Sequence, residues 1–186
     1  MNKEPGKVTV ILVHPNLPES KANKELVNSV NETDYISVFN LYEEQNTRMG
    51  VDEWTEIIFE SSVLVFQFPL YWMSAPYKLK KWLDEVFISL SRTPVVMGKS
   101  LLVVTTTGSG CDTYRSGGKN RFTIDEILRP YQAIAIHSGM VWETPVVIFG
   151  AGAEDSGRAI AEGAIQYKQK LEELAINYRS RTNIEW

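Results

Sequence analysis

The segment HPNLPESKAN, residues 14–23, contains side chains that could bind an anion. His14 follows an apolar run and can donate a hydrogen bond, and Ser20 stands where the N-cap of a helix is expected. The first turn of a helix also offers unpaired amide groups at the positive end of its dipole. These residues could hold a phosphate group, but a capped turn without a ligand would also explain them. Neither GxxxxGK nor GxGxxG occurs in the chain, which disfavours nucleotide loops of those two types.

The segment FPLYWMSAP, residues 68–76, places four large side chains in a row at a bend. Pro69 and Pro76 restrict the backbone on either side of it. Because loops lie on the surface, large apolar groups there need a partner. A stiff loop with aromatic rings and backbone amides suits a large planar ligand. The alternative is that these side chains pack on their own sheet or on a partner chain.

The segment TTTGSGCDTYRSGGKN, residues 105–120, is long for a loop in a compact domain and contains four glycines. Loops of this length are usually functional or disordered. Glycines allow backbone amides to approach a flat polar edge of a ligand, and Tyr114 could supply a polar contact. The alternative is a flexible surface excursion.

Taken together, the three segments could bind a phosphate, a flat ring and a polar ring edge. Flavin mononucleotide has these three parts, although other nucleotides share them. Of the remaining reactive side chains, His137 is expected to be structural because it lies late in a predicted helix, and Cys111 is expected to be an inert thiol. No cluster of His, Cys and carboxylate residues has the spacing of metal ligands, so no metal site is predicted.

The elements that must position these segments follow from hydrophobic periodicity. Strands are typically continuous apolar runs when buried on both faces, and helices show apolar residues at i, i+3, i+4 and i+7. This predicts strands at residues 8–13, 35–41, 62–68, 99–107 and 144–150. It predicts helices at residues 21–30, after an N-cap at Asp52, at 79–87, from a Thr123–Glu126 capping box to residue 137 with a bend at Pro130, and at 155–175.

Alternating strands and helices predict an α/β fold with right-handed crossovers and a parallel sheet covered on both faces. With five strands, the expected order is the flavodoxin-like 2-1-3-4-5. Ligands in such sheets bind beyond the carboxyl ends of the strands at the topological switch point. That rule selects the loops after the first, third and fourth strands, which are the three segments described above.

Composition narrows the classes of function. A chain of 186 residues predicts a single domain over residues 1–186. The net charge of −4, from 19 basic and 23 acidic residues, makes nucleic acid or an anionic membrane an unexpected partner. No stretch approaches 18 apolar residues, so no membrane insertion is expected. The single cysteine, Cys111, allows no internal disulfide, which fits a cytoplasmic protein.

Four stretches together resemble a known family, the NAD(P)H:quinone oxidoreductases of the flavodoxin-like fold. They are HPNLPESKAN, FPLYWMSAPYKLKKWLDEVF, VTTTGSGCDTY and ILRPYQAIAIHSGMVWETP, and they follow one another from residue 14 to residue 145. The second stretch is the most specific. The similarity is strongest to small bacterial members, which include the ancillary subunits of glutathione-gated potassium efflux systems.

The resemblance implies a homodimer with a flavin in each of two shared sites. FMN is favoured over FAD because the chain has no extension that could cover an adenosine. The implied cofactor-binding residues are His14, Ser20 and Asn23 at the phosphate, Pro69, Leu70, Tyr71, Trp72 and Met73 along the isoalloxazine ring, and Thr106, Thr107, Gly108 and Ser109 at its pyrimidine edge. Tyr114 matches a tyrosine near the reacting end and is the implied catalytic residue.

The implied activity is transfer of a hydride from NADPH or NADH through the flavin to a quinone, by a ping-pong mechanism. Amides of Thr107, Gly108 and Ser109 would stabilise negative charge on the reduced ring. The alternative function is a regulatory flavoprotein subunit that docks on a potassium efflux transporter. A flavodoxin-type electron carrier is disfavoured by the HPNLPES loop and by the modest acidity of the chain.

Two departures from the family pattern matter. Ser109 stands where the family usually has a second glycine. Asn120 stands where the animal enzymes have a histidine six residues after the tyrosine, which argues against a Tyr–His proton relay.

Overall fold

Largely apolar segments form the centre of the sheet in the computed structural model, which describes residues 4–181 and the side chains of residues 4–178. The three central strands are β1 (Lys7–Leu12), β3 (Ser61–Pro69) and β4 (Ser100–Thr106). Every residue of β3 and β4 is buried, as expected for strands covered on both faces.

All strand pairings in the sheet are parallel, and the order is β2-β1-β3-β4-β5. The predicted flavodoxin-like order is therefore confirmed. The edge strands are β2 (Ile36–Asn40), β5 (Val141–Trp142) and β6 (Val146–Ile148). Both β5 and β6 pair with β4, so the predicted fifth strand is divided into two short ones. Pro145 lies between them and has no amide proton to continue a ladder.

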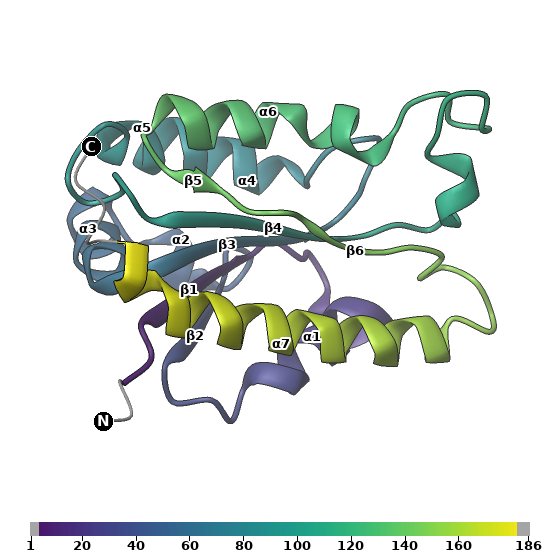
Figure 1. Cartoon of the computed structure of the whole chain (residues 1–186), viewed down its shortest axis with the longest axis horizontal. Helices are drawn as coiled ribbons and strands as arrows, with labels where there is room; N and C mark the ends of the chain where they lie inside the picture. The colour runs from purple at the N-terminus through teal and green to yellow at the C-terminus, as the bar shows by residue number, and fades with distance from the viewer. Residues whose placement is uncertain (1–3, 182–186) are drawn as a thin grey trace.

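Helices cover both faces of the sheet, and each face has its own hydrophobic core. Figure 1 shows α4 and α6 above the sheet and α1 and α7 below it. The core against α1 and α7 is built around Leu26, Val65 and Tyr167, and the other around Trp54, Phe66 and Trp82. The helical segments are η1 (Leu17–Glu19), α1 (Lys21–Val30), α2 (Glu44–Thr47), α3 (Val51–Glu60), α4 (Tyr77–Trp82), η2 (Leu83–Phe87), α5 (Ile88–Leu90), η3 (Cys111–Thr113), α6 (Ile124–His137) and α7 (Gly157–Arg181).

Two local expectations about helices are wrong. Asp52 does not cap α3: the N-cap is Gly50, whose amide donates to the carboxylate of Glu53 at 3.0 Å. The apolar stripe after Pro76 is buried as predicted, but it is not one regular helix, because Leu83–Phe87 is a π-helical turn. By contrast, the Thr123–Glu126 capping box at the start of α6 is present.

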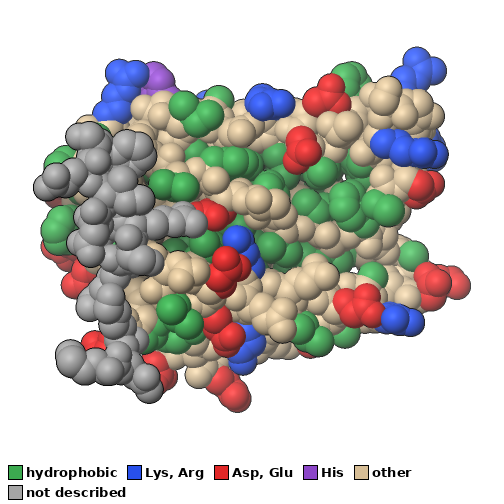
Figure 2. Space-filling view, in the orientation of Figure 1, with side chains coloured by type: hydrophobic (Ala, Val, Ile, Leu, Met, Phe, Trp, Pro, Cys, Tyr) green, Lys and Arg blue, Asp and Glu red, His purple; other side chains and the backbone are tan. Residues whose placement is uncertain are grey.

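The carboxyl ends of β1, β3 and β4 lie at one end of the sheet, so the three selected loops come together there. In Figure 1 the loops that follow β4 and β6 lie at the right-hand end. Acidic and basic side chains are interspersed on the face drawn in Figure 2, without a continuous field of one sign. Within the described range, no helix combines the length and apolar character needed to cross a bilayer.

Candidate functional site

The loop after β1 presents a buried histidine. His14 is held by its backbone, since its amide donates to Asn40 Oδ1 at 3.3 Å and its carbonyl accepts from Asn40 Nδ2 at 3.2 Å. The amide of Asn16 donates to His14 Nδ1 at 3.1 Å, which leaves the ring proton on Nε2. Burial lowers the pKa of His14 from its usual 6.5. At neutral pH the ring is therefore a neutral donor.

The helix α1 begins beside this histidine. Ser20 is its N-cap, with Oγ accepting from the amide of Asn23 at 3.1 Å. The hydroxyl proton of Ser20 and the amides of Lys21 and Ala22 have no hydrogen-bond partner in the described part of the chain. A helix of 10 residues thus directs free donors to the place where a phosphate was predicted.

The loop after β3 is a tight turn with an unusual backbone. Tyr71 and Ser74 exchange two backbone hydrogen bonds, at 2.8 and 3.1 Å. The two residues between them, Trp72 and Met73, have φ of 47° and 62°. Turns of this kind normally carry Asn and Gly at these positions, because a side chain with positive φ is strained. The amide of Ala75 donates to Tyr131 Oη at 3.0 Å, which fixes the turn to α6.

The loop after β4 is tied to β6. Thr107 donates its amide to the carbonyl of Ile148 at 2.9 Å and its hydroxyl to the carbonyl of Ser109 at 2.8 Å. The expectation that the Thr107 amide faces a ligand is therefore wrong, because the sheet already uses it. The amides of Gly108 and Ser109 have no partner among the described residues.

A cavity of about 470 Å³ joins the three loops. It brings together nine of the predicted residues, which are His14, Ser20, Asn23, Pro69, Leu70, Tyr71, Thr106, Thr107 and Gly108. Four predicted residues do not line it: Trp72, Met73, Ser109 and Tyr114. Trp72 is instead 99% exposed, and Met73 is also exposed.

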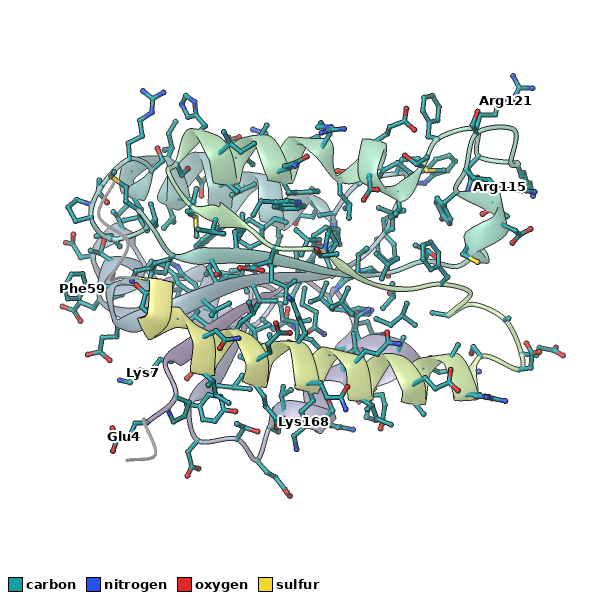
Figure 3. The ribbon with its side chains drawn as sticks, in the orientation of Figure 1. Glu4, Lys7, Phe59, Arg115, Arg121 and Lys168 are labelled. Carbon is teal, nitrogen blue, oxygen red and sulfur yellow. The ribbon has the colours of Figure 1, made fainter. Side chains whose placement is uncertain are left out.

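Tyr114 lies on the long loop beyond the cavity, where its ring packs against Phe149 with centroids 5.7 Å apart. Asn120 donates its amide and its side chain to Thr113, both at 3.1 Å, so it closes the loop instead of pairing with Tyr114. The loop is thus an ordered structure with its own hydrogen bonds. Arg115 and Arg121 point outward from it, as Figure 3 shows.

Sequence reasoning missed the segment after β6, which supplies Ala151 and Gly152 to the cavity. A Cβ on Gly152 would lie 3.3 Å from both Cα and O of Gly108, so the two backbones approach closely. The signal in the sequence was the stretch AGAE, residues 151–154, between the last predicted strand and the last predicted helix. Other lining residues that were not predicted are Asn16, Glu19, Lys21 and Ala22, which come from the first loop.

The arrangement suits a ligand with an anionic group and a polar ring edge. Donors come from His14, Ser20 and the first turn of α1 on one side, and from the Gly108 backbone on the other. The lining also contains one acidic residue, Glu19, and one basic residue, Lys21. Pro69, Leu70 and Tyr71 give an apolar wall between the two groups of donors. The residues present therefore fit the phosphate and ring of a flavin mononucleotide.

Comparison with known proteins agrees with this geometry. A family model described as flavodoxin-like fold matches residues 6–171. The chain is 36% identical over 167 residues to general stress protein 14 of Bacillus subtilis (strain 168), covering 84% of this chain and 95% of that protein. It is 35% identical over 153 residues to the glutathione-regulated potassium-efflux system ancillary protein KefG of Serratia proteamaculans (strain 568). This match covers 80% of this chain and 84% of that protein.

A solved structure is also similar. It is general stress protein 14 from Treponema denticola in complex with FMN, which is 27% identical with a TM-score of 0.82 and covers 90% of this chain and 99% of that one. The family match extends over most of the chain and includes every loop of the cavity. The chain belongs to the family of proteins with the flavodoxin-like fold.

Proposed function

We propose that this protein is a flavin-dependent NAD(P)H:quinone oxidoreductase that uses FMN and works by a ping-pong mechanism. The observation that carries the proposal is the single cavity in which phosphate-type donors, an apolar wall and a polar backbone edge meet. A relative with the same fold has been crystallised with FMN, which supports the choice of cofactor. The segment FPLYWMSAPYKLKKWLDEVF, which resembles that of quinone oxidoreductases, supports the choice of acceptor.

Each side of the cavity has its own task in this proposal. Ser20 and the first turn of α1 bind the phosphate, and His14 donates through Nε2. Pro69, Leu70 and Tyr71 would lie along the ring. The backbone of Gly108 would face the pyrimidine edge, where preorganised donors stabilise the negative charge that reduction creates. FMN held in the cavity would supply the redox chemistry, which is the transfer of a hydride from the nicotinamide to the quinone.

A flavin held against Pro69, Leu70 and Tyr71 would leave its other face open for substrates. NADPH or NADH and the quinone would use this face in turn, which is the basis of the proposed ping-pong mechanism. Tyr114 stays a candidate donor to the quinone oxygen, although reaching it requires the loop to move because Tyr114 does not line the cavity. Asn120 bonds to Thr113, so Tyr114 acts without a histidine partner.

A second copy of the chain completes the site in this proposal. Trp72 is 99% exposed at a strained position, and Tyr71, Met73 and Tyr77 are exposed beside it. Large apolar groups grouped in this way mark interaction surfaces. We therefore propose a homodimer in which this turn contacts both the flavin and the partner chain.

The proposed location is the cytoplasm. A single cysteine, Cys111, allows no internal disulfide, which fits a reducing environment.

The test is a titration of the purified protein with FMN and FAD, followed by steady-state assays with NADPH and NADH and a simple quinone. FMN is expected to bind with quenching of its fluorescence, and quinone reduction is expected to require it. Parallel lines in double-reciprocal plots at several quinone concentrations would support the ping-pong order. Absence of flavin binding and of turnover with both nicotinamides would disprove the enzyme proposal.

A second candidate function is supported by the similarity to KefG. In that case the protein is a regulatory flavoprotein subunit that docks on a potassium efflux transporter. The two functions are compatible, because a docked subunit can retain its redox chemistry. Co-purification of a membrane transporter with the tagged protein from its own host, lost on substitution of exposed residues away from the cavity, would favour this second role.

A further inference from the structure

A chain of buried polar side chains runs beneath the cavity and connects four elements. Tyr167 on α7 contacts Gln67 on β3, Gln67 contacts Asn23 on α1, and Asn23 contacts Thr106 on β4. The distances are 3.0 Å from Tyr167 Oη to Gln67 Oε1, 3.4 Å from Gln67 Nε2 to Asn23 Oδ1 and 3.1 Å from Asn23 Nδ2 to Thr106 Oγ1. All four side chains are at least nine-tenths buried.

The direction of this chain of hydrogen bonds is fixed at Gln67. Its Nε2 lies 3.3 Å from the backbone carbonyl of Asn23, and a carbonyl oxygen can only accept. The Gln67 amide is therefore oriented with Nε2 towards Asn23 and Oε1 towards Tyr167. Because Oε1 is also only an acceptor, the hydroxyl of Tyr167 must donate. Burial raises the pKa of Tyr167, so the hydroxyl keeps its proton.

The same reasoning continues to the cavity. Since Gln67 Nε2 donates to Asn23 Oδ1, the other end of the Asn23 amide is the Nδ2 group, which donates to Thr106 Oγ1. The oxygen of Thr106 is thus an acceptor within the chain, and its own proton is free. Thr106 lines the cavity, and no acceptor for this proton occurs among the described residues. The hydroxyl is left to donate to whatever occupies the cavity.

Packing alone does not explain why these four polar side chains are buried together. Four polar groups buried between sheet and helices cost free energy unless every one is satisfied, and apolar side chains of similar size would fill the same space. Here each side chain has a hydrogen-bond partner in the next one, and the Thr106 hydroxyl proton, at the wall of the cavity, has no acceptor among the described residues. Hydrogen bonds aligned in one direction also polarise one another, which strengthens the terminal donor.

We propose that Tyr167, Gln67 and Asn23 are positioning residues that hold the hydroxyl of Thr106 as a hydrogen-bond donor to an acceptor atom of the bound flavin. The inference rests on the proposed flavin-dependent function and extends it to three residues, of which Tyr167 and Gln67 do not line the cavity. Without Gln67, the Asn23 amide is free to rotate and present its oxygen to Thr106. The Thr106 proton would then turn to Asn23 and away from the ligand.

The experiment is a double-mutant cycle on FMN affinity, measured by fluorescence quenching in wild type, Gln67→Leu, Thr106→Val and the double variant. Gln67→Leu and Thr106→Val are each expected to weaken FMN binding by about fivefold, the value of one ordinary hydrogen bond. The double variant is expected to bind no more weakly than Thr106→Val alone. Thr106→Ser keeps the hydroxyl and is expected to restore both the affinity and its sensitivity to Gln67→Leu.

Additive losses in the cycle would overturn the inference, because they would mean that Gln67 acts through the general packing of the site. If Gln67→Leu does not fold, Tyr167→Phe takes its place in the cycle, because it removes only a single oxygen. Its loss of FMN affinity is likewise expected only when residue 106 carries a hydroxyl. Failure of the wild type to bind FMN would instead overturn the proposed function, and this inference with it.

Discussion

At the scale of single residues, the clearest conflict between local preference and structure lies in the turn after β3. Trp72 and Met73 both adopt positive φ, where bulky side chains are strained, and the Trp72 ring gains no packing within the chain because it is 99% exposed. Strain that nothing in the monomer relieves indicates a contact made outside it. This supports the proposal that the turn contacts a flavin and a second chain.

Replacing Trp72 with glycine is expected to stabilise the fold while weakening ligand binding or turnover. Glycine adopts positive φ without steric cost, so Trp72→Gly should raise the free energy of unfolding by about 1 kcal/mol, as measured by urea denaturation without flavin at low protein concentration. FMN binding or quinone turnover should fall. Arg92→Gly is the matched control: Arg92 also has positive φ, of 61°, but follows α5, outside both the cavity and the turn after β3, and should leave FMN affinity unchanged. A loss of stability in Trp72→Gly would show that the ring packs within the monomer.

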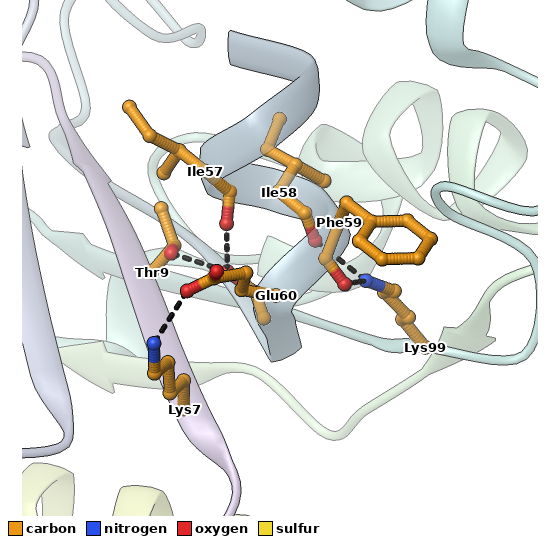
Figure 4. Close-up of polar contacts among 8 residues, drawn as sticks. Lys7, Thr9, Ile57, Ile58, Phe59, Glu60 and Lys99 are labelled. Atoms are coloured by element: carbon orange, nitrogen blue, oxygen red, sulfur yellow. Dashed lines mark hydrogen bonds and ion pairs between the residues drawn. The ribbon is translucent and has the colours of Figure 1, made fainter. Parts of the chain in front are cut away.

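At the scale of elements, the end of α3 shows how side chains from the sheet can replace a glycine cap. The last carbonyls of a helix need donors, and α3 has no glycine after it. Lys99, which is buried, donates to the carbonyls of Ile58 and Phe59 at 2.5 and 2.6 Å, and Ser61 donates to the carbonyl of Ile57. Figure 4 shows these contacts beside the Lys7–Glu60 ion pair. The end of α3 is therefore joined to β1 and β4.

This buried lysine predicts a dependence of stability on pH. Burial lowers the pKa of Lys99 from 10.5 to about 8 in the folded protein. Between these two values the unfolded chain binds the proton and the folded protein does not, so stability should rise with pH. At about 1.4 kcal/mol per pKa unit, the rise should approach 3 kcal/mol across the whole interval.

The measurement is urea denaturation of wild type and Lys99→Met at several pH values from 8 to 10.5. All other ionisable groups are the same in both proteins, so the difference between the two isolates Lys99. The stability of wild type relative to the variant should increase with pH. A difference that stays constant would mean that the carbonyl contacts keep Lys99 charged in the folded state.

At the scale of the whole molecule, the two layers of helices differ in what they leave exposed. Around the turn after β3 and the start of α4, exposed apolar side chains are grouped together, and they include Trp72 and Tyr77. On the opposite layer, α7 exposes isolated apolar side chains such as Ile165. Grouped apolar side chains mark an interface more strongly than scattered ones. The proposed homodimer therefore uses the α4 side of the molecule.

A single charge should test which face associates. Tyr77 is 68% exposed, so Tyr77→Glu should leave the fold intact while placing a carboxylate in the proposed interface. The dimer should weaken by at least tenfold in sedimentation equilibrium, since an uncompensated buried charge costs several kcal/mol. Ile165→Glu, at a position 58% exposed on the other layer, should leave the dimer unchanged. The opposite pattern would place the interface on α7.

The sequence by itself determined the main strands and helices and their succession along the chain. Continuous apolar runs identified the central strands, apolar spacing identified the helices, and the Thr123–Glu126 pair located the start of α6. These signals are local, because strand burial, helix periodicity and caps depend on neighbours within a few positions. The rule that parallel strands bind ligands at their carboxyl ends then selected three loops, and nine of the predicted residues line one cavity.

Only the tertiary structure decided how individual groups are used. The amide of Thr107 donates to the carbonyl of Ile148, 41 positions further along the chain. The side chain of Gln67 accepts a hydrogen bond from Tyr167, 100 positions away. The division of the last strand, the π-helical turn and the strained conformation of Trp72 also depend on what packs against them. A hydrogen-bond donor in the sequence is only a potential donor. Its partner is set by which distant elements the fold brings within about 3 Å of it.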